Sequence, residues 1–242
     1  YTSKRYLVAK NEEAYRDVFT IHYPDEERPD ARPAKTSPVY DKLKRMGAVF
    51  GQRYGWERAN WFAPEGVEPK DEWSFRRSNY FEHVGNECRR LREKVGVIDL
   101  TPFTKFEVTG PGAEGWLDSL VANKVPTKVG RIALCHALTQ RGGIRSEFTI
   151  TKLADHHYYV VSAGAAERYD SDFLQKRLPT DGSVALRNIT GSRGVFVLAG
   201  PRARDVLAKL TDVPLDNASF PWLTGQVIEA GLATDVYALR VN

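Results

Sequence analysis

One pattern occurs twice in this chain, as Val108-Thr-Gly-Pro-Gly-Ala-Glu-Gly-Trp-Leu-Asp-Ser-Leu120 and again, from 108 to 198 or 90 residues later, as Leu198-Ala-Gly-Pro-Arg-Ala-Arg-Asp-Val-Leu-Ala-Lys-Leu210. Each copy runs from an apolar residue through Gly-Pro to an Ala and two Leu at helical spacing. A strand, a Gly-Pro turn and a short helix form one supersecondary unit. Two copies therefore predict a duplicated α+β core, with chance similarity as the alternative.

Strand signals fill the space between the two copies. They fall at Ile132–Leu138, Ile144–Leu153, Tyr158–Ser162 and Val184–Ile189, with a predicted helix at Ala165–Leu174. Strands and helices do not alternate strictly, which favours mixed or antiparallel sheets with short helices over a doubly wound fold. The segment Gln226–Asn242 is predicted to form two further strands around a turn at Gly231.

The chain before Tyr80 is less regular. We expect short helices at Asn11–Phe19 and from Ser37 to Met46, and an extended connection over Tyr23–Pro33, where three prolines stand among charges. The stretch Val49–Pro69 is rich in aromatic residues without a clear period, so we predict a loop held by aromatic anchors. Helical spacing returns at Val84–Val95.

Composition excludes several classes of protein. Hydrophobic residues make up 42% and charged residues 27% of the 242 residues, an ordinary globular balance. No apolar run approaches the roughly 20 residues of a membrane span, and the start lacks a secretory pattern. The net charge of +4 is spread along the chain without a block of like charges. We therefore expect neither a membrane nor a nucleic-acid partner, while a mildly basic domain suits a polyanionic small ligand.

The cysteines and histidines give no metal signature. Cys88 and Cys135 fit no metal spacing and no disulfide framework, so we expect two reduced, buried or half-buried thiols and a reducing compartment. His156-His157 precedes an apolar strand and is interpreted as a turn. The sequence also lacks a P-loop and Gly-x-Ser-x-Gly. This disfavours a P-loop nucleotide site or a nucleophilic hydrolase within the chain.

The most pointed local feature is Gly142-Gly143 followed by Ile144-Arg-Ser-Glu-Phe-Thr-Ile-Thr151. The glycines allow a tight turn, and the strand after them alternates. Glu147 and Thr149 then share one face, where a carboxylate can accept hydrogen bonds from an amine-bearing ring or act as a base. The alternative is a half-exposed strand with a solvated polar face.

Several motifs carry a family resemblance over nearly the whole chain. Lys35-Thr-Ser-Pro-Val-Tyr-Asp41, Gly47-Ala-Val-Phe50 and Tyr54-Gly-Trp-Glu-Arg-Ala-Asn-Trp-Phe62 resemble the central stretch of dimethylglycine and sarcosine dehydrogenases. Gly96-Val-Ile-Asp-Leu-Thr101, Val108-Thr-Gly-Pro111, Gly142-Gly143 and Gly200-Pro201 resemble the glycine-cleavage T-protein (aminomethyltransferase) module of those enzymes. The resemblance implies a T-protein-like folate-binding fold that is incomplete in this chain.

The resemblance implies two domains. Residues 1–80 would be the tail of a flavin half with its connecting segment, and residues 81–242 a folate-binding domain truncated at its C-terminal end. In such enzymes a flavin domain, with FAD, oxidises an N-methyl amine to an iminium. The folate module captures that carbon as 5,10-methylenetetrahydrofolate. The implied cofactors are tetrahydrofolate and, in the N-terminal part of the parent protein, FAD.

The resemblance also assigns site residues. The family's key carboxylate, usually Asp, matches Glu147, which is expected to hydrogen-bond or deprotonate the folate amine as it attacks the iminium. The extra methylene displaces the carboxylate by roughly an ångström, an error that can cost about 10²-fold. Leu134 and Thr149 match positions that line the pterin pocket, and Trp222 matches an aromatic position against the folate. For Leu134 and Trp222 the alternative is core packing.

The chain differs from the family at its end. The family continues into Tyr-x-Gly-Glu-x-Gly-aromatic-Glu, which supplies further folate ligands, whereas this sequence stops at Arg240-Val241-Asn242. We therefore expect an internal fragment of a longer protein.

The resemblance leaves two alternative functions open. One is a non-catalytic regulatory or interaction module of the same family, which the change from Asp to Glu keeps open. The other is a stand-alone folate-dependent aminomethyl or methyl transferase, which the stretch before Tyr80 argues against. Bacterial cytoplasm and mitochondrial matrix fit the composition equally well.

Overall fold

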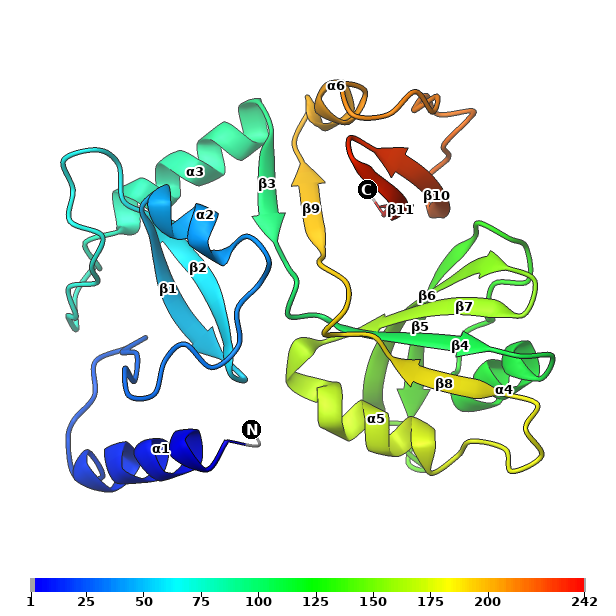
Figure 1. Cartoon of the computed structure of the whole chain (residues 1–242), viewed down its shortest axis with the longest axis horizontal. Helices are drawn as coiled ribbons and strands as arrows, with labels where there is room; N and C mark the ends of the chain where they lie inside the picture. The colour runs from blue at the N-terminus through cyan, green and yellow to red at the C-terminus, as the bar shows by residue number, and fades with distance from the viewer. Residues whose placement is uncertain (1–2, 242) are drawn as a thin grey trace. The chain divides into compact units, whose positions relative to one another are not determined.

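A computed structural model describes residues 3–241, which divide into two compact units (Figure 1). Unit 1 comprises the described residues up to Thr101 together with Phe196–Pro201, and unit 2 comprises Pro102–Val195 and the described residues from Arg202 on. Within the described part of the chain, no helix has the length and apolar character needed to cross a membrane. The sheets are antiparallel, so the predicted α+β class with short helices is confirmed.

Unit 1 contains three helices and two small two-stranded sheets among its described residues. Its elements are α1 (Lys4–Arg16), α2 (Tyr40–Arg45), β1 (Ala48–Arg53), β2 (Trp56–Phe62), α3 (Phe81–Glu93), β3 (Gly96–Asp99) and β9 (Phe196–Ala199). Strands β1 and β2 form a hairpin, and β3 pairs with β9 across nearly one hundred residues of sequence.

The hairpin β1–β2 corrects the prediction of a loop over Val49–Pro69. Tyr54 and Gly55 connect the strands with φ of 53° and 85°, the backbone of a two-residue hairpin turn. The register shifts between Val49 and Phe50. This irregularity breaks the alternation of apolar and polar residues, which is why the strand period was not visible in the sequence.

The aromatic residues of this hairpin do form anchors. Trp61 is 1% exposed and stacks on Tyr80 and His83 with ring centroids 5.9 and 5.5 Å apart. Its indole Nε1 donates to Asp71 at 2.8 Å. A buried tryptophan with its polar atom satisfied contributes strongly to a small core.

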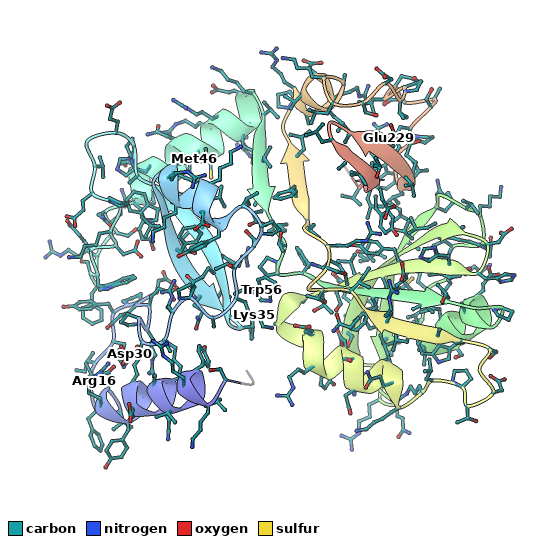
Figure 2. All side chains as sticks on the ribbon, viewed as in Figure 1. Arg16, Asp30, Lys35, Met46, Trp56 and Glu229 are labelled. Atoms are coloured by element: carbon teal, nitrogen blue, oxygen red, sulfur yellow. The ribbon has the colours of Figure 1, made fainter. Side chains whose placement is uncertain are left out.

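Helix α1 begins earlier than the predicted Asn11–Phe19. Ser3 caps its first turn by accepting from Tyr6 N at 3.5 Å, and the helix ends at Arg16 before the expected apolar residues. Arg16 Nη1 pairs with Asp30 at 3.2 Å, on the connection that follows (Figure 2). That connection has no helix or strand over Tyr23–Pro33, as predicted, but it is fixed by ion pairs.

Unit 2 is built on a five-stranded antiparallel sheet with the order β5-β6-β7-β4-β8. The strands are β4 (Thr104–Thr109), β5 (Ile132–Leu138), β6 (Ile144–Ala154), β7 (His157–Ser162) and β8 (Ala185–Asn188). Helix α4 (Ala113–Leu120), the 3₁₀ turn η1 (Gly164–Ala166) and helix α5 (Glu167–Gln175) complete this part. Each strand lies close to its predicted position.

The core of unit 2 lies on one face of this sheet, which we call the inner face. Trp116 and Leu117 of α4 and Phe173 and Leu174 of α5 pack there against Phe106 and other strand residues. The remaining strand residues of the cluster are Val108, Cys135, Ala137, Phe148, Ile150, Tyr158 and Val160. Residues that alternate with them on the strands form the outer face.

A second hairpin contacts the outer face. Its strands are β10 (Thr224–Ala230) and β11 (Ala233–Arg240), preceded by the short helix α6 (Ala203–Leu207). Tyr237 of β11 packs edge to face on Tyr159 of β7 with centroids 5.2 Å apart. The hairpin therefore covers the β7 side of the outer face near Tyr159.

Both copies of the Gly-Pro pattern fold into a strand, a turn and a helix, as predicted. Gly110 and Gly200 have φ of +116° and +112°. A Cβ atom would lie 2.3 Å from the carbonyl oxygen of Ser183 at Gly110, and 2.6 Å from that of Leu91 at Gly200. Positive φ and this close approach explain why glycine stands at both turns.

One cysteine differs from the prediction. Cys135 is buried in the unit 2 core, but Cys88 is exposed on α3. The helical spacing placed Cys88 on the apolar stripe, whereas α3 buries none of its residues fully. Both cysteines are free.

Candidate functional site

The predicted site residues lie on the outer face where β5 and β6 pair. The register places Leu134 opposite Thr149 and His136 opposite Glu147. Cys135, Ser146 and Phe148 alternate with them and are buried toward the inner face. The structure therefore brings Leu134, Glu147 and Thr149 together, as the alternation of β6 predicted.

The Gly-Gly turn sets the position of Glu147. Gly142 has φ of +78°, and its N–H donates to Thr139 O at 2.9 Å. Thr139 N in turn donates to Gly143 O at 2.8 Å, and Gly143 N donates to Thr139 Oγ1 at 3.1 Å. The turn is closed by three hydrogen bonds, and β6 begins directly after it at Ile144.

Glu147 projects from the open part of the outer face. Its side chain is 62% exposed, and its Oε2 lies 3.1 Å from His136 Nε2. Within residues 3–241, no donor other than His136 contacts this carboxylate. The other oxygen, Oε1, is available to a hydrogen-bond donor from a ligand.

Two apolar side chains lie near this part of the sheet, Leu134 on β5 and Trp222 at the edge of β5. Leu134 is 47% exposed and Trp222 is 61% exposed, so neither is a core residue. Trp222 Nε1 donates to Val241 O at 3.1 Å. The O atom of its neighbour Leu223 accepts from Ile132 N at 3.0 Å, which ties the Trp222 segment to the edge of β5 that does not pair with β6. No contact between Trp222 and Glu147 is present.

His136 is the residue that sequence reasoning missed. The cross-strand register of the β5–β6 hairpin was the signal that could have identified it, because it decides which residue faces Glu147. The register shifts between Ala137 and Leu138, directly before the turn. Counting back from Gly142-Gly143 without this bulge gives the wrong partner.

A polar cluster of Lys152, Glu114 and Tyr158 holds β6 to α4. Lys152 Nζ donates to Glu114 Oε2 at 2.8 Å and to Thr127 O at 2.9 Å, and Tyr158 donates to the same Glu114 oxygen at 2.6 Å. The hydrogen bond from Lys152 lowers the pKa of Glu114, and the bond to Glu114 raises the pKa of Lys152. Burial, aided by Glu114, raises the pKa of Tyr158 to about 12. The cluster is structural and fixes the strand that carries Glu147.

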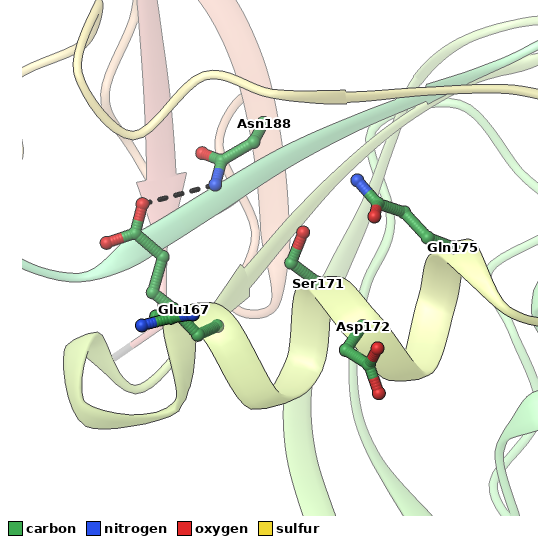
Figure 3. Close-up of a pocket in the computed structure, with 6 residues that line it drawn as sticks. Glu167, Ser171, Asp172, Gln175 and Asn188 are labelled. Carbon is green, nitrogen blue, oxygen red and sulfur yellow. Dashed lines mark hydrogen bonds between the residues drawn. The ribbon is translucent and has the colours of Figure 1, made fainter. Parts of the chain in front are cut away.

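A shallow hollow of about 210 Å³ lies elsewhere, between α5 and β8 (Figure 3). It is lined by Glu167, Arg168, Ser171, Asp172, Gln175 and Asn188. Asn188 Nδ2 donates to Glu167 Oε1 at 3.2 Å across it. The lining is polar, and the volume is below the roughly 300 Å³ at which small-molecule sites begin. None of the four predicted site residues belongs to it.

Metal chemistry finds no support in the described part of the chain. Residues 3–241 contain no group of three or more His, Cys, Asp or Glu side chains placed to hold an ion. The outer-face site offers one carboxylate, one imidazole, one hydroxyl and apolar side chains. This set suits a flat organic ring that carries an N–H donor.

Two family models match the chain. One, described as the GCVT N-terminal domain, matches residues 39–242, and the other, described as the FAD dependent oxidoreductase central domain, matches residues 1–37.

Similar curated proteins extend these matches. The chain is 37% identical over 225 residues to mitochondrial dimethylglycine dehydrogenase of Mus musculus, covering 92% of this chain and 26% of that protein. It is 29% identical over 246 residues to the mitochondrial pyruvate dehydrogenase phosphatase regulatory subunit of Mus musculus, covering 100% of this chain and 28% of that protein. The chain thus spans little more than a quarter of the length of these relatives.

A solved structure shows the same fold. The glycine cleavage system aminomethyltransferase T from Bartonella henselae superposes with a TM-score of 0.64 at 23% sequence identity. The alignment covers 80% of this chain and 47% of that one. At this identity the likeness establishes the T-protein-like fold and no more.

Proposed function

The chain belongs to the GCVT N-terminal domain family, and on this premise we propose that it is the tetrahydrofolate-binding part of an enzyme that oxidises an N-methyl amine of the dimethylglycine or sarcosine type. In this proposal the module captures the iminium carbon as 5,10-methylenetetrahydrofolate. The flavin half lies in the same parent protein, and residues 1–80 connect it to a folate-binding domain over residues 81–242. The match of residues 1–37 to the FAD dependent oxidoreductase central domain supports this arrangement.

The observation that carries the proposal is the placement of Glu147. Its carboxylate stands on the outer face beside Leu134 and Thr149, with one oxygen open to a ligand. Tetrahydrofolate, when bound, supplies the amine nitrogen that takes up the one-carbon unit. Glu147 accepts a hydrogen bond from that amine and then its proton as the new carbon–nitrogen bond forms.

The neighbours of Glu147 serve binding and orientation. Leu134 offers exposed apolar surface for one face of the ring, and Thr149 offers a hydroxyl that donates or accepts. Trp222 stands at the same edge of β5 and provides a flat surface for an aromatic part of the ligand. The orientation of the ring relative to Glu147 governs rate strongly, because displacement by about 1 Å can cost about 10²-fold.

The test uses the natively expressed protein. Formation of methylenetetrahydrofolate during amine oxidation is compared for wild type and Glu147→Ala, with tetrahydrofolate affinity measured by calorimetry. We expect the variant to lose about 10²- to 10⁴-fold in the rate of capture, the range of general-base catalysis. Glu229→Ala is the matched control, since Glu229 is an exposed carboxylate on β10 (Figure 2). Unchanged capture by Glu147→Ala overturns the assigned role.

One observation favours a second function, a non-catalytic regulatory or interaction module. The similar mouse protein named as a phosphatase regulatory subunit covers the whole of this chain. Under this alternative the natively expressed protein has no measurable tetrahydrofolate affinity. A stand-alone transferase, the third possibility, predicts that the purified protein contains no flavin.

The mouse relatives are named as mitochondrial, which suits a matrix protein in a eukaryote. In a bacterium the same proposal places the protein in the cytoplasm.

A further inference from the structure

We propose that His136 is a positioning residue for Glu147, holding one carboxylate oxygen so that the other points at the ligand amine. This inference rests on the proposed function of Glu147 and extends it to a residue on the neighbouring strand. It starts from the cross-strand pair itself, in which His136 Nε2 lies 3.1 Å from Glu147 Oε2.

The chemistry of the pair fixes the direction of the hydrogen bond. An ionised carboxylate only accepts, so the hydrogen between these atoms belongs to His136 Nε2. Oε2 is thereby engaged with the protein, and Oε1 is left to accept from a ligand. Because of the imidazole, Oε2 of Glu147 has a partner within the protein, and Oε1 can take one from the ligand.

Glu147 needs such a partner because its side chain can adopt several conformations. Its side chain has three rotatable bonds and is 62% exposed on a flat strand surface, so packing does not select one rotamer. A hydrogen bond from a fixed donor restricts these torsions before the ligand arrives. Preorganisation of this kind improves reaction geometry more than it improves binding.

His136 is itself held from both sides of its strand. On one side β5 pairs with β6 along the whole site. On the other, Ala122 N donates to His136 O at 2.8 Å, and Asn123 Nδ2 donates to Leu134 O at 2.8 Å. The segment at 122–123 therefore caps the edge of β5 at the site, so the imidazole projects from a fixed backbone.

A second pair on the same sheet shows what a purely structural histidine–glutamate contact looks like. His157 Nε2 also lies 3.1 Å from a glutamate oxygen, that of Glu107. There the carboxylate is only 16% exposed, and its second oxygen pairs with Arg187 at 3.0 Å. Both oxygens of Glu107 are used inside the protein, whereas Glu147 has one left over.

The experiment is a double-mutant cycle in the natively expressed protein, using tetrahydrofolate and the amine substrate. The variants are His136→Ala, Glu147→Gln and the double variant, with His157→Ala as the matched control. We expect His136→Ala to lower the rate of methylenetetrahydrofolate formation about 10-fold or more while changing tetrahydrofolate affinity less than about 3-fold. The double variant should be no slower than Glu147→Gln alone, because the two residues act through one atom.

Two further readouts separate positioning from general damage to the fold. His136→Gln keeps an amide N–H near the place of Nε2–H, so it should restore most of the rate that His136→Ala loses. The nitrogen spectrum of the labelled imidazole should show His136 with its proton on Nε2 in wild type, and a changed tautomer ratio in Glu147→Gln.

The outcomes distinguish the two proposals. If Glu147→Gln is impaired while His136→Ala is not, or if their losses add in the double variant, the positioning role is wrong and the proposed function stands. If Glu147→Gln is as active as wild type, the proposed function of Glu147 is wrong, and the role of His136 falls with it.

Discussion

At the scale of single residues, the site is defined by the hydrogen-bonding atoms and the apolar surface that its side chains leave exposed. Glu147 commits one oxygen to His136 and exposes the other, while Leu134 and Trp222 leave apolar surface uncovered. Exposed apolar side chains and a carboxylate oxygen without a partner leave both apolar contact and a hydrogen-bond acceptor open to a ligand. Glu107 also pairs with a histidine, but its second carboxylate oxygen pairs with Arg187, so neither oxygen is left for a ligand.

The two cysteines should differ sharply in reactivity. Burial raises the pKa of the Cys135 thiol from 9.0 to about 11, whereas Cys88 is exposed on α3. The thiolate is the reactive form, so at pH 8 Cys135 stays protonated and shielded. We expect a disulfide exchange reagent to titrate one thiol in the native chain and two after denaturation. Rapid labelling of both thiols in the native state would contradict the buried position of Cys135.

Replacement of a turn glycine by alanine should lower the free energy of unfolding by different amounts at Gly200 and Gly142. Gly200→Ala combines positive φ with a Cβ 2.6 Å from the carbonyl oxygens of Leu91 and Lys94, so we expect a loss of roughly 3 kcal/mol in unfolding free energy. Gly142→Ala has positive φ but open space around the new atom, so strain alone should cost about 1–2 kcal/mol. Urea unfolding measures both, and equal losses would refute the steric argument at Gly200.

At the scale of elements, the accuracy of sequence reasoning depended on irregularities in the strands. From Ile132 on, alternation and glycine turns placed β5, β6, β7 and β8 of the five-stranded sheet near their true bounds. The hairpin β1–β2 was missed because its register shifts between Val49 and Phe50, where Asn60 of β2 has no partner in the register, and this interrupts the strand period. The bulge after Ala137 likewise concealed His136, although the face of Glu147 followed from β6 alone.

The hydrogen-bonded cluster of Lys152, Glu114 and Tyr158, which joins β6 to α4, should make the free energy of unfolding depend on pH. Glu114 has a folded pKa below its ordinary 4.5, chiefly through Lys152, so the unfolded chain takes up the proton first as pH falls. Its contribution to stability is therefore complete above about pH 5 and is lost as the pH falls through the folded pKa. Glu114→Gln should be less stable than wild type at pH 7, with the difference shrinking toward pH 3 in urea unfolding curves. A pH-independent difference would show that the charge of Glu114 is not what stabilises the cluster.

At the scale of the whole molecule, the chain has separate cores in its two units. Trp61 belongs to a core of unit 1 with Val49 and Ala63, and the unit 2 core has no member from that hairpin. Trp61→Ala should cost about 3–5 kcal/mol locally. In hydrogen exchange we expect faster exchange for β1 and β2 and unchanged exchange for β5–β7. A loss of protection in both units together would show that they unfold as one.

The central claim is that the ligand occupies the outer face of β5–β6, and hydroxyl-radical footprinting tests it most directly. Leu134 and Trp222 are 47% and 61% exposed, and Tyr169 on α5, at 50%, is an internal reference away from that face. With saturating tetrahydrofolate on the natively expressed protein, oxidation of Leu134 and Trp222 should fall severalfold relative to Tyr169. Unchanged ratios under saturation, or protection confined to the hollow beside α5, would contradict the account.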